Sequence, residues 1–82
     1  MVNVNEFKEA LYNNVVKFTF TKVDGTEREA TGTTRTNDLI YYNAIPEGKW
    51  KSNPGVIAYF DLEKESWRSC RENSIISFEI IH

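Results

Sequence analysis

The spacing of hydrophobic residues changes along the chain, from a helical period at the start to a period of two in the next segment. Val4, Phe7 and Leu11 fall on one face of a helix, and Asn3 stands where a capping residue is preferred. We therefore expect a helix over residues 1–13. Because so short a helix is marginal alone in water, its apolar stripe must cover one face or the open end of a sheet.

The segment 15–34 alternates apolar and polar residues and predicts a β-hairpin. Its Asp24-Gly25 turn allows two registers, and a two-residue loop would place Phe20 opposite Glu29. A three-residue loop ending at Gly25 fits better, because it sets small residues opposite large ones and uses glycine in the left-handed conformation. The expected pairs are Phe20 with Arg28, Phe18 with Ala30 and Val16 with Gly32, where a bend is expected.

Residues 35–55 show no clean period and carry Pro and Gly breakers, so we interpret them as a long irregular connection. One short strand is expected within it, around Leu39 to Tyr42. Residues 56–82 contain three runs of strand composition, and the turns between them are too short for crossover helices, so we expect antiparallel pairing. A helix and about five strands predict a mainly β fold in a single domain, 1–82: a small, strongly bent antiparallel barrel. The three runs are Val56 to Asp61, Trp67 to Glu72 and Ile75 to Ile81.

The formal net charge of -2 argues against a nonspecific binder of duplex DNA, which would need a basic face. Cys70 is the single cysteine, so no intramolecular disulfide is expected. The first residues lack the pattern of a secretion signal, and no apolar run is long enough to span a bilayer. We therefore expect a cytoplasmic location and no membrane partner.

The strongest candidate for a ligand site is Trp67 with Arg68 and Arg71, because planar guanidinium groups hold phosphate and flat rings stack on bases. In a regular strand the two arginines would point to opposite sides, so they converge only if a bulge or twist intervenes. They could instead pair with nearby glutamates, and Trp67 could close the barrel end. The irregular connection adds a second set of candidate binding residues: Tyr41, Tyr42, Asn43, Lys49 and Trp50.

Catalysis finds little support in the sequence. His82 is the single histidine, and a buried thiol is the simpler interpretation of Cys70. No zinc ligand set is present, and Asp61, Glu63 and Glu65 fit a solvated acidic turn better than a calcium loop. We therefore expect no enzyme activity, no metal and no cofactor.

Four segments of the chain carry a resemblance to a known family: Val16 to Ala30, Phe60-Asp-Leu-Glu-Lys, Trp67-Arg-Ser-Cys-Arg71 and Ile75-Ile-Ser-Phe-Glu79. Together they resemble a family of small tailed-phage proteins described as WYL-like, with an Sm-like, SH3-type barrel. The similarity covers a little over half of the chain. The family's Trp-Arg-Ser-Phe-Arg-Val-Asp element matches at Trp67, Arg68, Ser69 and Arg71, whereas Cys70 replaces its aromatic residue.

The resemblance implies binding rather than catalysis, since related WYL modules are similar to ligand-sensing domains that recognise nucleotides or single-stranded nucleic acid. It also implies a phage origin, with a role in countering host defence signalling in the host cytoplasm. The alternative function is inhibition of a host enzyme through the aromatic segment Leu39 to Trp50. Exposed strand edges in small barrels also favour a homo-oligomer.

Overall fold

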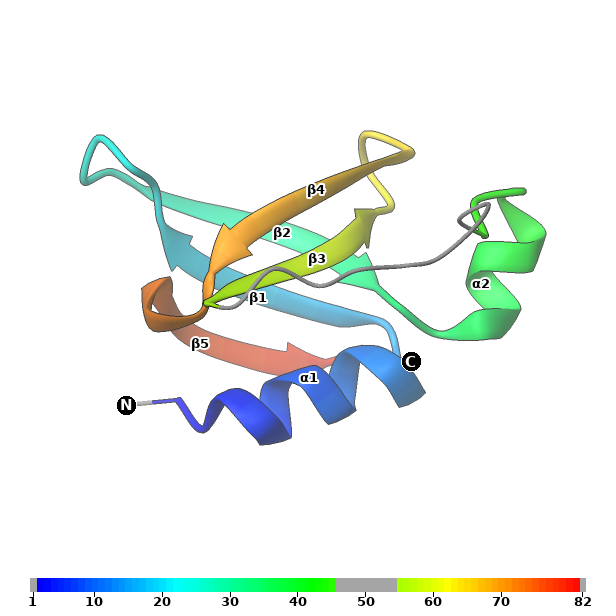
Figure 1. Cartoon of the computed structure of the whole chain (residues 1–82), viewed down its shortest axis with the longest axis horizontal. Coiled ribbons are helices and arrows are strands. Elements are labelled where there is room, and N and C mark those ends of the chain that lie inside the picture. Colours follow the sequence, from blue (N-terminus) through cyan, green and yellow to red (C-terminus); the bar gives the residue numbers. More distant parts are fainter. Residues whose placement is uncertain (1, 46–54, 82) are drawn as a thin grey trace.

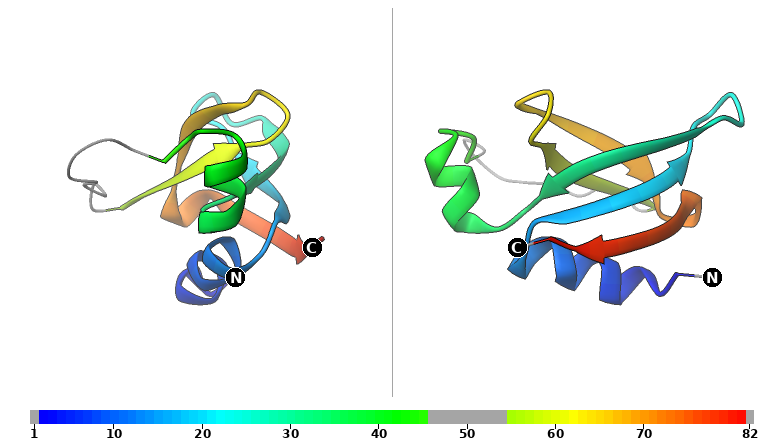
Figure 2. Two further views of the ribbon diagram at one scale, coloured as in Figure 1. Left: turned by 90° about the vertical axis from the view of Figure 1, so that its right-hand side faces the viewer. Right: turned by 180° about the vertical axis from the view of Figure 1, so that it is seen from behind.

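The computed structural model describes residues 2–45 and 55–81 (Figure 1). Within these residues, five antiparallel strands form one sheet in the order β4-β3-β2-β1-β5, which is strongly bent but not closed (Figure 2). The predicted mainly β class with an N-terminal helix is confirmed. The elements are α1 (Val4–Asn13), β1 (Val16–Thr21), β2 (Glu27–Thr33), α2 (Thr36–Tyr41), β3 (Val56–Asp61), β4 (Ser66–Arg71), a 3₁₀ turn (Glu72–Ser74) and β5 (Ile75–Ile80).

Helix α1 begins with the predicted cap, since the backbone N–H of Glu6 donates to Asn3 Oδ1 at 3.1 Å. Phe7 and Leu11 are buried from one face of the helix and join the core cluster of the sheet. The helix runs along the concave side of the bent sheet, next to β5 (Figures 1 and 2). Its apolar stripe therefore covers one sheet face, as the sequence predicted.

The β1–β2 hairpin has the predicted register, with Phe20 opposite Arg28, Phe18 opposite Ala30 and Val16 opposite Gly32. The hairpin turns through a three-residue loop, residues 23–25. A hydrogen bond of 2.6 Å from the Lys22 N–H to the Thr26 carbonyl closes this loop. Gly25 takes a φ of 90°, the left-handed conformation that the loop requires.

The core forms around the inward face of β1, because alternation points every second residue of that strand toward α1 and β3. Phe18 lies at its centre, with ring centroids of Phe7 and Tyr59 at 5.0 and 4.9 Å in edge-to-face geometry. Val16 and Phe20 belong to the same interior, and Phe78 packs against it while only partly buried.

Strand β2 leaves β1 and meets β3 over a short distance, and this divergence shapes the site described below. The ladder between β2 and β3 consists of the pairs Gly32–Asp61 and Thr33–Phe60. A Cβ atom at Gly32 would lie 2.7 Å from Tyr59 Cδ2, so only glycine allows this close crossing. Beyond the crossing, the hairpin end of β2 and the paired strands β3 and β4 separate.

The prediction of a strand around Leu39 to Tyr42 is wrong, because this segment belongs to helix α2 and the turn after it. Asp38, at the start of the helix, forms an ion pair with Arg35, and an acidic residue is favourable in the first turn. Asn43 then ends the helix with a φ of 54°. Its N–H donates to the Ile40 carbonyl and the Ala44 N–H donates to the Leu39 carbonyl, a Schellman motif.

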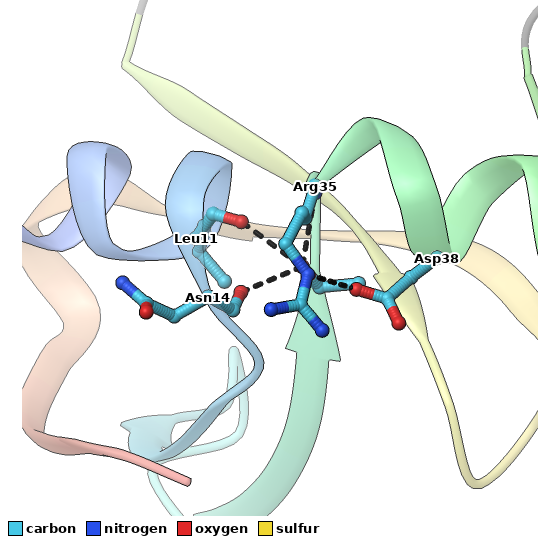
Figure 3. A network of polar contacts seen from close by, with 5 residues as sticks. Leu11, Asn14, Arg35 and Asp38 are labelled. Carbon is cyan, nitrogen blue, oxygen red and sulfur yellow. Dashed lines mark hydrogen bonds and ion pairs between the residues drawn. The ribbon is translucent and has the colours of Figure 1, made fainter. Parts of the chain in front are cut away.

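Buried Thr33 connects the two helices to the sheet. Figure 3 shows the residues that meet at this point, among them Leu11, Asn14 and Arg35. The Thr33 hydroxyl oxygen lies 3.0 Å from the Leu11 carbonyl oxygen and 2.7 Å from that of Asn14, and it accepts from the Arg35 N–H at 2.9 Å. Because Leu11 and Asn14 lie at the end of α1 and Arg35 precedes α2, one hydroxyl fixes both helix ends to β2.

Candidate functional site

A groove of about 540 Å³ lies between the end of the β1–β2 hairpin and strands β3 and β4. This volume is within the range of small-molecule sites, roughly 300–1,000 Å³. Apolar side chains, among them Phe20 and Tyr59, form much of its lining. Four cationic side chains also line this hollow, which we call the basic groove: Lys22, Arg28, Arg68 and Arg71.

The groove brings together Arg68 and Arg71, which a flat strand would separate. Both residues are on β4, where Arg68 pairs with Tyr59 and Arg71 with Val56, and all four residues line the groove. Strand β4 is at one end of the sheet order and Arg71 is its last residue. Twist at a sheet edge and the length of the arginine side chain allow the convergence.

The cations opposite β4 come from the hairpin, whose turn projects toward the same side as the end of β4 (Figure 1). Lys22 lies at the turn, and Arg28 is in β2 opposite Phe20. The sequence analysis did not include these two residues among the candidates. The signal for Arg28 was present in the predicted register, which placed a cation on the apolar face of the hairpin.

Among the groove cations, Arg28 has a carboxylate partner, with Nη2 3.5 Å from Oδ2 of Asp61. Asp61 is 1% exposed, and its other carboxylate oxygen accepts the backbone N–H groups of Glu63 and Lys64. It therefore stabilises the β3–β4 turn while it balances part of the charge on Arg28.

Arg68 and Arg71 are exposed, and within residues 2–45 and 55–81 neither guanidinium forms an ion pair. The glutamate pairing considered from the sequence is therefore not seen there. Glu72, the residue directly after Arg71, instead accepts from Lys8 Nζ at 2.7 Å. The two arginines keep their donors directed at solvent, where an anion could accept from them.

Two uncharged titratable side chains, Tyr59 and Cys70, also line the groove. Burial raises the pKa of Tyr59 to about 12, and the nearby Arg28 and Arg68 charges act in the opposite direction. Burial likewise raises the pKa of the Cys70 thiol to about 11. Both groups are therefore neutral near pH 7, and Cys70 has the buried character expected from the sequence rather than that of an activated nucleophile.

The side chain of Trp67 does not line the basic groove with Arg68 and Arg71. It lines a second hollow of about 490 Å³ between α1, α2 and β3, which contains mostly apolar side chains such as Leu11 and Leu39. Its indole N–H donates to the Ala44 carbonyl at 2.9 Å, and its ring packs edge-on against Phe60. The structure thus uses Trp67 to hold α2 against the sheet.

The remaining predicted site residues lie at α2 or beyond it. Tyr42 packs on Phe60 at a centroid distance of 5.5 Å, whereas Tyr41 is 80% exposed. Asn43 forms the helix end described above. Lys49 and Trp50 lie outside the described residues. The structure does not bring Tyr41, Tyr42 or Asn43 to the basic groove, and their role in binding stays a prediction.

Residues 2–45 and 55–81 show neither a metal-binding cluster nor a membrane-spanning helix. No cluster of three or more His, Cys, Asp or Glu side chains able to hold a metal ion was found in these ranges. No helix there is both long and apolar enough to cross a membrane.

The N-terminal helix, the strand order and the strong bend of the sheet define a small Sm-like, SH3-type domain, here with a cationic groove on its surface. The WYL_2 family, described as having an Sm-like SH3 beta-barrel fold, matches residues 4–76, and the chain belongs to this family. The Sm-like, WYL-like part of the sequence resemblance is thereby confirmed. No curated protein and no solved structure matched the chain.

Proposed function

We propose that this chain is a non-enzymatic binding module that holds a nucleotide or a short nucleic acid in the basic groove. The observation that carries the proposal is the convergence of Arg68 and Arg71 with Lys22 and Arg28 around one hollow. Guanidinium groups bind phosphate through two donors in a fixed planar geometry, which the ammonium group of lysine does not provide.

The apolar part of the groove favours a ligand with a flat, weakly polar body attached to its anionic group. Simple inorganic anions would leave the lining beside Phe20 and Tyr59 in contact with water, whereas a nucleobase or sugar would cover it. A nucleotide combines both features. Membership of a family with an Sm-like barrel is compatible with this use of the domain.

Thermal unfolding in the presence of nucleotides and short oligonucleotides tests the proposal. A ligand at about 100 times its Kd stabilises the folded state by about 2.7 kcal/mol. For a domain of 82 residues this corresponds to a rise in Tm of roughly 10 to 20 °C. We expect Arg68→Ala and Arg71→Ala to remove most of this rise while leaving the Tm without ligand almost unchanged.

Lys64→Ala is the matched control, because Lys64 is an exposed cation in the β3–β4 turn and does not line the groove. It should keep the full ligand-induced rise. Trp67→Phe tests the sequence prediction that a base stacks on the indole ring. The proposal fails if no nucleotide or oligonucleotide raises the Tm, or if Lys64→Ala weakens binding as much as Arg71→Ala.

The cellular role that we propose is sequestration of a nucleotide signal in the host cytoplasm, which would counter host defence. This part of the proposal is supported by the resemblance to small phage proteins. A bacterial strain that carries a nucleotide-dependent defence system would test it. Expression of the intact chain should restore phage growth there, and expression of Arg71→Ala should not.

The competing proposal is inhibition of a host enzyme through the aromatic segment Leu39 to Trp50. In its favour, Ile40, Tyr41 and Ile45 are 60%, 80% and 51% exposed and form an apolar surface around α2. Inhibition predicts no stabilisation by any nucleotide and a host complex that survives size-exclusion chromatography. Tyr41→Ala should dissociate that complex, whereas Arg71→Ala should not.

We also propose a homo-oligomer, because β4 and β5 are the two ends of the sheet order and each has one backbone edge without a strand partner in the described sheet. Pairing of these edges between copies would satisfy their backbone groups. Light scattering of the purified chain tests this directly, and a monomeric mass at high concentration would contradict it.

A further inference from the structure

We infer that the basic groove is built for a phosphomonoester, the doubly charged phosphate of a mononucleotide or of a nucleic-acid terminus, rather than for a phosphodiester within a strand. The inference rests on the proposed function and specifies the chemical group that the groove recognises.

The charge of the groove is the first argument. Four cationic side chains line it, and two carboxylates offset part of their charge: Asp24 in the lining and Asp61 beside Arg28. Two positive charges therefore remain uncompensated. A phosphomonoester carries about -1.5 to -2 at pH 7, which matches them, whereas a diester carries a single negative charge.

The position of the cations is the second argument. Arg68 and Arg71 extend from β4, whereas Lys22 extends from the hairpin end, so donors reach the groove from two walls. A terminal phosphate offers three outer oxygens and can accept from both walls at once. An internal diester has two free oxygens, and its chain must leave the phosphate in two directions.

The contacts that hold the two carboxylates in place are the third argument. Hydrogen bonds from the hydroxyl and the N–H of Thr26, at 2.7 and 3.0 Å, lower the pKa of Asp24. The Asp61 carboxylate is held by Arg28 and by backbone donors of the β3–β4 turn. The offset is therefore a fixed part of the structure.

Titration calorimetry with adenosine 5′-monophosphate and its 5′-methyl phosphate ester tests the inference on the intact chain. The two probes share base and sugar and differ by one ionisable oxygen. Near pH 7.5 we expect the monophosphate to bind at least about tenfold more tightly. The second pKa of a phosphomonoester is about 6, so the difference should shrink as the pH falls toward about 5.5.

The groups facing the ligand should not cause this pH dependence themselves. Histidine is the side chain whose ordinary pKa lies in the range from about pH 5.5 to 7.5. None of the charged or titratable side chains in or behind the lining is a histidine: they are Lys22, Asp24, Arg28, Tyr59, Asp61, Arg68, Cys70 and Arg71.

Charge variants complete the test. Arg71→Gln leaves one uncompensated charge and should reduce the preference for the monophosphate to below about threefold, whereas Lys64→Gln, outside the groove, should keep it. Equal affinity of the intact chain for both probes would overturn the phosphomonoester inference and leave the proposed binding function standing. Failure of both these probes and the wider nucleotide panel to bind would overturn the function as well.

Discussion

Phe18→Ala should cost this protein a large part of its stability. The side chain is 1% exposed, and its ring lies at the centre of the core. Truncation of a buried phenylalanine to alanine costs about 3 to 5 kcal/mol. The edge-to-face contacts with Phe7 and Tyr59, at 5.0 and 4.9 Å, place the expected value near the upper end, since each such pair contributes about 0.5 to 1.5 kcal/mol.

Total stability sets the scale for this loss. Folded domains have about 0.05 to 0.15 kcal/mol per residue, which for 82 residues gives roughly 4 to 12 kcal/mol. Urea unfolding followed by circular dichroism measures the change in midpoint and slope. If Phe18→Ala does not fold, Phe18→Leu should still report a smaller loss of about 1 to 2 kcal/mol.

Val23→Ala is the control, because Val23 is 90% exposed in the hairpin turn. Substitutions at such positions change stability by less than about 0.5 kcal/mol. A Phe18→Ala variant with the midpoint and slope of the unmodified chain would refute the placement of this ring in the core.

Two further outcomes are expected. Thr33→Val removes the hydroxyl shared by both helix ends and should cost about 1 to 3 kcal/mol in urea unfolding; an equal loss in exposed Thr36→Val would contradict this role. Alkaline pH should also destabilise the fold, because burial raises the pKa of Tyr59 from 10.0 to about 12 and that of Cys70 from 9.0 to about 11. The unfolded state loses these protons first, so stability is complete below pH 9 and falls as the pH rises through 12. Unfolding midpoints that stay constant from pH 8 to about 11 would rule this out.

The hairpin and the first helix could be predicted because local chemistry determines them. Asp24-Gly25 permits a three-residue loop, and alternation in β1 then fixes every pair in the register. Asn3 likewise marks the start of α1 by supplying an acceptor for the first turn.

Helix α2 could not be predicted from propensity, because its six residues, Thr36–Tyr41, include three that favour turns and caps. Tertiary contacts stabilise it instead. Leu39 is buried, and the turn that Asn43 ends is held by the hydrogen bond from Trp67 to Ala44. These contacts join segments far apart in the chain, which a local pattern does not reveal.

The basic groove, too, could be predicted only in part from the sequence. The sequence identified Arg68 and Arg71 as cations beside an aromatic residue, but their convergence depends on how far β2 and β3 separate after the Gly32–Asp61 pair. That separation also decides that Lys22 faces β4. Spacing along one strand carries no information on the distance between strands that are not adjacent.

Strand β1 pairs with β2 across a short turn and with β5 from the other end of the chain, and this has a consequence for the order of folding. Hairpins form in about 1 to 10 μs, whereas contacts between distant segments must first close a long loop and form more slowly. Lys22 and Arg28 therefore reach their positions early, and the β4 arginines join them only after the long-range strands have docked. A nascent or partly unfolded chain would lack the assembled phosphate receptor, so ligand capture is reserved for the native state.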